Sequence, residues 1–328
     1  MNVFRTDFSR ILLYLLLFSL FLHARPVPAE STSAEKAAGL STGEEEAQTG
    51  DLYLENEYNY VDASMDVSNG IPDNAAGRLL RIKETGKLVV ATEPYYPPQE
   101  FIDPSLSGQE QYVGADMELA KLIAERMDVE LMIVPLDFTD VLSGIAAGEY
   151  DLAISALSYT PERAASMTLS KGYYYAEGGS RTGLMIRSED RTRFTDVESL
   201  SGRDLIVQRG SIQELLATEN ISRYRQFRRA STLNDVYLAL QTGQVHAAAV
   251  DLEAAARYIS SNPGCRLALI DNVSFSLEEQ FQGDRIAAPK GEGQLIGFVN
   301  GVIDEVLADG LYMSWYEDAV ARSGELGM

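Results

Sequence analysis

The spacing of apolar residues from residue 86 onward switches repeatedly between the strand pattern and the helix pattern. Leu88–Ala91 is a short apolar run bounded by Gly86 and Pro94, as expected of a buried strand. Within 114–127 the apolar residues recur every three to four positions, which predicts a helix. The same criteria predict strands over 130–134 and 151–156 and a helix over 138–148. Because strands alternate with helices, we expect an α/β domain with a largely parallel sheet.

The alternation returns farther along the chain, which indicates a second α/β unit. The last helix is predicted over 295–307, where the apolar residues again recur every three to four positions and Gly310 follows as a terminator. The other elements predicted here are strands over 184–186, 205–207, 245–250, 267–270 and 285–288, and helices over 211–217, 232–242 and 252–259.

The first 29 residues have the layout of a secretory signal. A start with Arg5 and Arg10 is followed by the twelve-residue apolar run 11–22, and small residues close the segment at Val27-Pro28-Ala29. A membrane anchor is the alternative, but a spanning helix needs about 20 apolar residues. We therefore expect 1–29 to be cleaved and the mature chain to be exported to the periplasm or the extracellular space.

Residues 30–77 carry much of the chain's acidity. This segment holds eleven Asp and Glu residues and one Lys, is rich in Ser, Gly, Asn and Ala, and has no sustained apolar period. Such a composition is typical of a disordered, self-repelling linker. The net charge of the whole chain, −22, argues against nucleic acid as a partner, because that binding requires basic patches.

Few residues here suit metal or redox chemistry. Cys265 is the single cysteine, so the chain cannot form an intramolecular disulfide, and His246 is the single histidine after residue 29. A lone cysteine is most often a small buried apolar residue. We expect no metal and no cofactor.

The most informative candidate for ligand chemistry is Arg163, in the run Ser155 to Arg163. Thr160 suits an N-cap and Pro161 the first helical position, so Arg163 falls in the opening turn of a helix. A cation is unfavourable there unless an anion compensates, and a guanidinium can hold a carboxylate with two hydrogen bonds. Ser158 adds a hydroxyl on the same loop. The alternative is a surface arginine paired with Glu162.

Three further stretches offer polar or aromatic groups at strand and helix ends. Ser211 follows a glycine turn and is a candidate cap whose helix could also present N–H groups to an anion. Asp251 follows a buried strand, where α/β sheets place ligand groups, although it could simply cap the helix from Leu252. Glu93 and Tyr96 lie on the proline-rich loop after the first strand, where Tyr96 could form a ligand wall or pack as ordinary loop structure.

These pieces resemble, in order, the extracellular solute-binding proteins of family 3, the polar amino-acid receptors of ABC importers. The resemblance covers about 86–319 and is carried by TEPYYPP, GADMELAKLIAERM, FTDVLSGIAAGEYDLAISALSYTPER, GSIQELL, GQVHAAAVD and DEVLADGLYMSWYEDA. It implies a two-lobed α/β fold of the type II periplasmic-binding-protein kind, in which two hinge crossovers join the lobes. Lobe 1 would comprise 78–182 and 277–328, and lobe 2 would comprise 183–276.

The resemblance also implies roles for individual residues. Arg163 would bind the α-carboxylate of an amino acid, with Ser158 and Ser211 as hydroxyl partners, and Asp251 would bind the α-ammonium. Tyr96 would be the aromatic wall, and Glu93 would contact the tip of the ligand side chain. Four positions depart from the family pattern and bear on side-chain choice: Ala156 replaces a frequent serine, His246 an acid, Gln99 an aromatic residue and Ile212 a hydroxyl residue.

The expected function is therefore the substrate-binding component of an amino-acid ABC importer. It would bind a polar or cationic amino acid between two closing lobes, work as a monomer with the importer's permease domains as partners, and catalyse no reaction. Two alternatives stay open. One is a periplasmic cyclohexadienyl or prephenate dehydratase-like enzyme, in which Glu93 or His246 would be the general acid. The other is a ligand-sensing module for a separate signalling partner.

Overall fold

The computed structural model describes residues 55–328. The predicted signal at 1–29 and the first part of the predicted acidic linker, 30–54, lie outside the described residues. Within 55–328, every helix is too short or too polar to cross a membrane.

A five-stranded sheet forms the centre of lobe 1, in the order β5-β1-β6-β14-β7. Strand β1 pairs in parallel with β5 and β6, whereas β14, which arrives from late in the chain, pairs antiparallel with β6 and β7. The strands are β1 (Lys87–Thr92), β5 (Glu130–Pro135), β6 (Leu152–Ser158), β7 (Met167–Leu169) and β14 (Asp284–Pro289).

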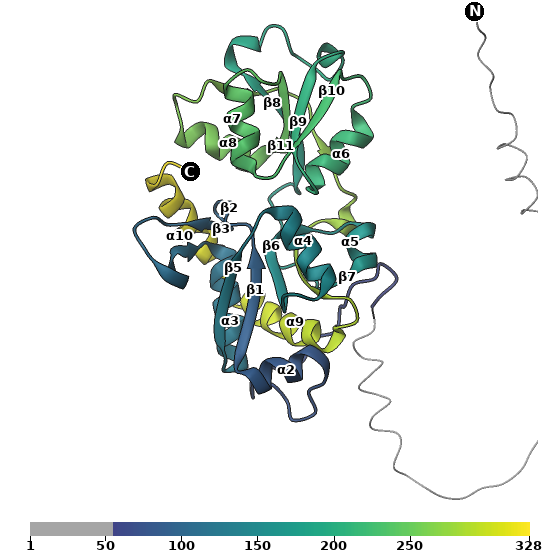
Figure 1. The fold of residues 1–328 in the computed structure, drawn as a ribbon, viewed down its shortest axis with the longest axis vertical. Coiled ribbons are helices and arrows are strands. Elements are labelled where there is room, and N and C mark those ends of the chain that lie inside the picture. The colour runs from purple at the N-terminus through teal and green to yellow at the C-terminus, as the bar shows by residue number, and fades with distance from the viewer. Residues whose placement is uncertain (1–54) are drawn as a thin grey trace, which may run out of the picture. The chain divides into compact units, whose positions relative to one another are not determined.

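Helices cover this sheet with their apolar faces, except α10, which packs against α3 and α9. Ten of the residues of α9 are buried, among them Phe298 and Val302, and Gly148 ends α4 in the left-handed conformation, as the sequence predicted. The helices of lobe 1 are α2 (Gly77–Thr85), α3 (Ala115–Met127), α4 (Phe138–Ala147), α5 (Pro161–Ser166), α9 (Gly293–Ala308) and α10 (Leu311–Glu325). Figure 1 shows α3 and α9 against this sheet. Gly310, with a φ of 66°, ends α9 but is followed directly by α10, which apolar spacing did not predict.

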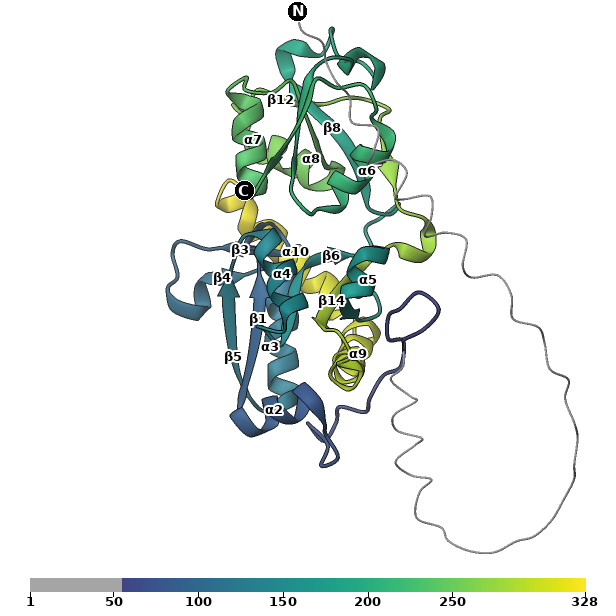
Figure 2. The same cartoon turned by 45° about the vertical axis from the view of Figure 1, so that its right-hand side comes forward.

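A second sheet forms the centre of lobe 2, in the order β10-β9-β11-β8-β12, with β13 paired to β8. Its strands are β8 (Arg181–Arg187), β9 (Asp204–Gln208), β10 (Gln226–Ala230), β11 (Ala247–Asp251), β12 (Leu267–Leu269) and β13 (Phe275–Ser276). Its helices are α6 (Ile212–Asn220), α7 (Leu233–Gln241) and α8 (Leu252–Ser261), which are labelled around the sheet in Figure 2.

Short elements complete the described chain. A small antiparallel sheet joins β2 (Tyr95–Tyr96), β3 (Glu100–Ile102) and β4 (Tyr112–Val113), and this sheet was not predicted. Single 3-10 turns lie at η2 (Gly108–Gln111), η3 (Ser188–Asp190), η4 (Glu198–Leu200) and η5 (Glu279–Phe281). Two sheets with helices around them confirm the predicted α/β class. The expectation of largely parallel sheets is wrong, because β14 pairs antiparallel in the first sheet and β8 pairs antiparallel with β11, β12 and β13 in the second.

The last part of the predicted linker is packed, which corrects the expectation of disorder for residues 55–77. Val61 and Val67 are buried in the core of lobe 1, and Val61 N donates to Leu169 O at 2.9 Å. The amide of Asn300, on α9, donates to the carbonyls of Val61 and Ala63 at 2.8 and 2.9 Å. The apolar residues of this segment are irregularly spaced because they follow an extended path over a helix, so periodicity did not reveal them.

Candidate functional site

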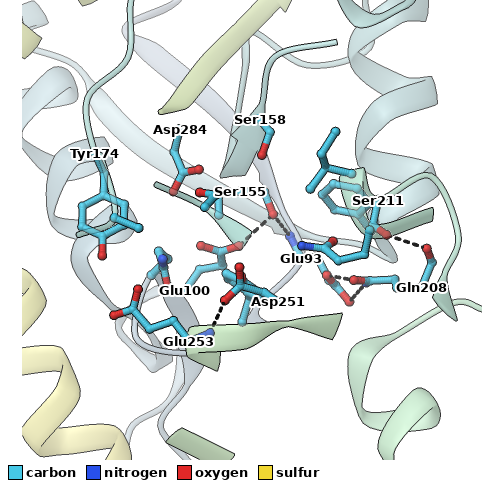
Figure 3. A pocket seen from close by; sticks show the side chains of 18 of the residues that line it. Glu93, Glu100, Ser155, Ser158, Tyr174, Gln208, Ser211, Asp251, Glu253 and Asp284 are labelled. Carbon is cyan, nitrogen blue, oxygen red and sulfur yellow. Dashed lines mark hydrogen bonds between the residues drawn. The ribbon is translucent and has the colours of Figure 1, made fainter. Parts of the chain in front are cut away.

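One pocket is lined by residues of both lobes, and all six predicted site residues line it. These are Glu93, Tyr96, Ser158, Arg163, Ser211 and Asp251. Figure 3 shows Glu93, Ser158, Ser211 and Asp251 around the same space, together with acidic residues that the sequence analysis did not select.

Arg163 is held by the protein itself. Thr160 caps α5, accepting from Arg163 N at 3.1 Å as predicted, and the side chain of Arg163 is turned back into the pocket. Nη1 donates to Ser158 O at 2.6 Å, and Nη2 donates to Gly210 O, in lobe 2, at 2.9 Å. The guanidinium also lies 5.4 Å from the ring centre of Phe138. Burial lowers its pKa to about 10, so the group keeps its charge at neutral pH.

The two serines differ in what their hydroxyls do. Ser211 caps α6 as predicted: its Oγ accepts from Glu214 N at 3.2 Å and donates to Gln208 O at 2.8 Å. Both functions of that hydroxyl are therefore used within lobe 2. Ser158 contributes its carbonyl to Arg163, and its hydroxyl lines the pocket.

Asp251 caps α8 through one oxygen only. Its Oδ1 accepts from the N–H groups of Glu253 and Ala254 at 3.0 and 2.9 Å, which leaves Oδ2 for another partner. Burial raises its pKa to about 6, with the charge of Glu253 acting in the same direction and the two N–H groups opposing it. The predicted capping role is confirmed, and the second oxygen is compatible with a ligand role.

Glu93 joins the two lobes. It directly follows β1, and both of its carboxylate oxygens accept from Nε2 of Gln208, at the end of β9, at 2.8 Å. Its own N–H donates to Ser155 Oγ at 3.0 Å. Burial raises the pKa of Glu93 to about 8, against the opposing effect of the Gln208 hydrogen bond. Tyr96, from β2, reaches across and packs against the core of lobe 2.

Sequence reasoning missed several lining residues, of which the acidic ones matter most. We call the carboxyl groups of Glu100, Asp251, Glu253 and Asp284 the acidic hollow; they line the pocket together with Tyr174 (Figure 3). Glu100 is the first residue of β3, directly before the apolar Phe101 and Ile102, and its place beside this short apolar run was the signal that the sequence offered. Asp284 could not be predicted without the strand pairing, which places it across the sheet from Ser158.

The carboxyl groups of the hollow repel one another. Burial, followed by the charge of Asp116, raises the pKa of Glu100 well above its usual range. Burial and the charges of Asp116 and Asp251 do the same for Asp284. Glu253 accepts from Arg257 and, at 3.1 Å, from the hydroxyl of Tyr316.

His246 lies away from this pocket. Its Nδ1 accepts from Asp204 N at 3.2 Å, and its ring meets Phe194 edge to face. The suggestion that His246 could act as a general acid in the cleft is therefore wrong. Across residues 55–328, no group of three or more His, Cys, Asp or Glu side chains is arranged to hold a metal ion.

Two α/β lobes with an ionisable pocket between them define the class of type II periplasmic binding proteins. Residues 88–319 match the bacterial extracellular solute-binding proteins, family 3, and the chain belongs to that family.

Individual relatives differ in what they bind. The chain is 28% identical over 227 residues to a probable histidine-binding protein of Campylobacter jejuni, covering 69% of this chain and 81% of that protein. It is 29% identical over 150 residues to a cyclohexadienyl dehydratase of Pseudomonas aeruginosa, covering 45% and 53%. An amino acid ABC transporter substrate-binding protein of Streptococcus pneumoniae, solved bound to L-arginine, is similar in structure with a TM-score of 0.65 and 29% identity, covering 74% and 97%.

Proposed function

We propose that this chain is the substrate-binding component of an amino-acid ABC importer and that it binds a cationic amino acid. The observation that carries the proposal is the charge of the pocket: Arg163 is accompanied by Glu93 and the four carboxyl groups of the acidic hollow. A ligand with one carboxylate and two cationic groups balances this set better than a neutral or acidic ligand does, because buried charges are tolerated only when paired. Relatives that bind histidine and arginine support the proposal.

The proposed binding mode is built from the hydrogen-bonding atoms that line the pocket. The ligand carboxylate takes the place of Gly210 O at Nη2 of Arg163, next to the Ser158 hydroxyl and the start of α6 at Ser211. The α-ammonium meets Oδ2 of Asp251. The side chain extends past Tyr96 towards Glu93, whose carboxylate exchanges part of its contact with Gln208 for the ligand cation.

Ligand binding and closure are coupled because the partners lie on different lobes. Arg163 and Glu93 belong to lobe 1, with proposed boundaries at 78–182 and 277–328, and Ser211 and Asp251 belong to lobe 2, at 183–276. Only a closed cleft satisfies both ends of the ligand, so differential contacts favour closure. The permease domains would then recognise the closed form of a monomeric, exported protein whose signal is 1–29.

A binding screen tests this function. We expect the unfolding midpoint of the purified chain to rise with L-arginine, L-lysine or L-histidine, to rise less with L-glutamine, and to stay unchanged with L-aspartate and L-glutamate. Calorimetry on the amino acids that raise it gives the affinity. If none of the twenty amino acids changes the midpoint or gives a binding heat, the proposal is wrong.

A dehydratase is the second candidate, because one relative carries that name and because burial raises the pKa of Glu93 to about 8, which suits a general acid. We favour binding without catalysis, since Glu93 is tied to Gln208 by both oxygens. Incubation with prephenate separates the two: turnover that disappears in Glu93→Gln would establish the enzyme, and no turnover by the native chain would exclude it.

A further inference from the structure

Asp284 is a buried carboxyl group in the pocket to which the sequence analysis assigns no role. It begins β14, where the chain returns from lobe 2, and its residue is 6% exposed. Its backbone is fixed, because Asp284 N donates to Tyr174 O and Asp284 O accepts from Tyr173 N, both at 2.9 Å. Its carboxylate accepts no hydrogen bond from residues 55–328 and lines the pocket, near Ser155 and Ser158 in Figure 3.

The carboxyl groups around Asp284 favour a cation beside it. Asp116, Asp251 and Glu253 all act on it as like charges. The charge of Arg163 opposes them, but its Nη1 and Nη2 already donate to Ser158 O and Gly210 O. Because a buried carboxylate without a partner is costly, a positive group between Asp284 and Asp251 would stabilise the ionised form of both.

The same geometry indicates which kind of cation fits between these carboxylates. Within the described chain, the acidic side chains are not grouped closely enough for a metal ion. An ammonium group suits the position, since it has three donors that can be shared between carboxylates on opposite walls. Register supports this placement: Asp284 pairs across the sheet with Ser158, so it lies beside the residue whose carbonyl orients Arg163.

We propose that Asp284 is a specificity-determining residue that contacts the α-ammonium of the bound amino acid from lobe 1, while Asp251 contacts it from lobe 2. This inference rests on the proposed function, because it assumes an amino acid in the pocket. Its consequence is that the ammonium is a bridge between lobes, so an otherwise identical ligand without an α-amino group loses the contacts of both carboxylates.

The test compares two ligands and two variants. L-arginine and 5-guanidinopentanoate share the carboxylate and the guanidinium, but only L-arginine has the α-amino group. We expect Asp284→Asn to weaken L-arginine about 10- to 100-fold, as expected for loss of a charged hydrogen bond, and to change 5-guanidinopentanoate by less than about threefold. Asp271→Asn, in an exposed turn, is the matched control and should change neither affinity.

Three outcomes overturn the inference. Unchanged L-arginine affinity in Asp284→Asn means that Asp284 does not contact the ligand. Equal losses for both ligands mean that it shapes the cleft instead. The third outcome is measured on Asp251→Asn, so it does not require a folded Asp284 variant. If Asp251→Asn binds both ligands equally, Asp284 does not contact the ammonium. If Asp251→Asn still prefers L-arginine, the result supports the contact with Asp284. If the native chain binds none of the amino acids in the screen described above, the proposed function fails; if it binds one of them but Asp284→Asn leaves that affinity unchanged, only this inference fails.

Discussion

At the Arg163 end of the pocket the protein supplies hydrogen-bond acceptors of its own, whereas the carboxyl groups of the acidic hollow are only partly supplied with donors: Asp251 and Glu100 each accept through one oxygen. Nη1 and Nη2 of Arg163 both donate to backbone carbonyls, one of them Gly210 O in the other lobe. Asp284 accepts from none of residues 55–328, and Oε2 of Glu100 is buried without a partner there.

Because of this difference, the carboxylate and the ammonium of a bound amino acid would gain binding free energy in different ways. Ser158 O and Gly210 O already accept two of the five N–H donors of Arg163, so a ligand carboxylate competes there with acceptors of the protein. A ligand ammonium displaces no protein group in the hollow and also removes repulsion between carboxylates. Under the proposed function, selectivity for cationic ligands would therefore originate mainly in the hollow, and Arg163 would fix the orientation of the ligand.

Removal of Arg163 should have the largest effect. In Arg163→Ala the ligand carboxylate enters a pocket of carboxyl groups without its counter-ion, and we expect L-arginine affinity to fall at least about 100-fold, or roughly 3 kcal/mol. Calorimetry measures the loss. Arg209→Ala, next to Gly210 but with an exposed side chain, is the control and should bind normally. Unchanged affinity in Arg163→Ala would show that the ligand binds elsewhere.

A change of pH should have an effect of intermediate size, and it should shift ligand affinity and folding stability in opposite directions. The pKa of Glu93 lies at about 8, raised from 4.5, so the folded chain holds this proton more tightly than the unfolded chain. Ligand-free stability should therefore fall as the pH rises from about 5 to 8. A cationic ligand requires the ionised carboxylates, so L-arginine affinity should rise over the same window, with Asp251, of pKa about 6, contributing at its lower end.

Thermal unfolding and calorimetry from pH 5 to 8 measure both trends. Glu93→Gln is the matched variant, because it keeps the shape and cannot ionise; it should flatten the upper part of both curves. L-arginine affinity that falls with rising pH below pH 8 would contradict the assignment of Glu93 to the ligand cation.

Loss of Gln208 should have the smallest effect. Its amide joins Glu93 across the lobes, so Gln208→Ala removes a contact of the closed form, but a ligand cation replaces part of it at Glu93. We expect affinity for L-arginine to weaken only about 3- to 10-fold, near the lower limit for a charged hydrogen bond. Gln244→Ala, exposed on lobe 2, is the control. A loss as large as that of Arg163→Ala would mean that Glu93 depends on Gln208 for every ligand contact.

Local chemistry allowed much of the fold and part of the site to be predicted. The strands around residues 88–91 and 151–156, and the caps at Thr160, Ser211 and Asp251, depend on near neighbours in sequence, so pattern and cap preference were sufficient. Strand β10 was missed because it is a half-exposed edge strand with two arginines and lacks an apolar run.

The missing parts of the site depend on contacts between distant positions. Asp284 reaches Ser158 only through the antiparallel pairing of β14 with β6, and a sequence carries no local sign of that register. The same holds for Gly210, whose carbonyl meets Arg163 from the other lobe. Spacing along the chain could propose a carboxylate clamp at Arg163, but it could not reveal that backbone oxygens already occupy part of it.

The packing of residues 55–77 has a mechanical consequence. Because Asn300 binds the carbonyls of Val61 and Ala63, a pull applied at residue 55 is transmitted into α9 and the sheet of lobe 1. Both chain segments that connect the lobes are C-terminal to this attachment, so a force applied at residue 55 does not act on them. A protein held from that side could open and close by movement of lobe 2 alone.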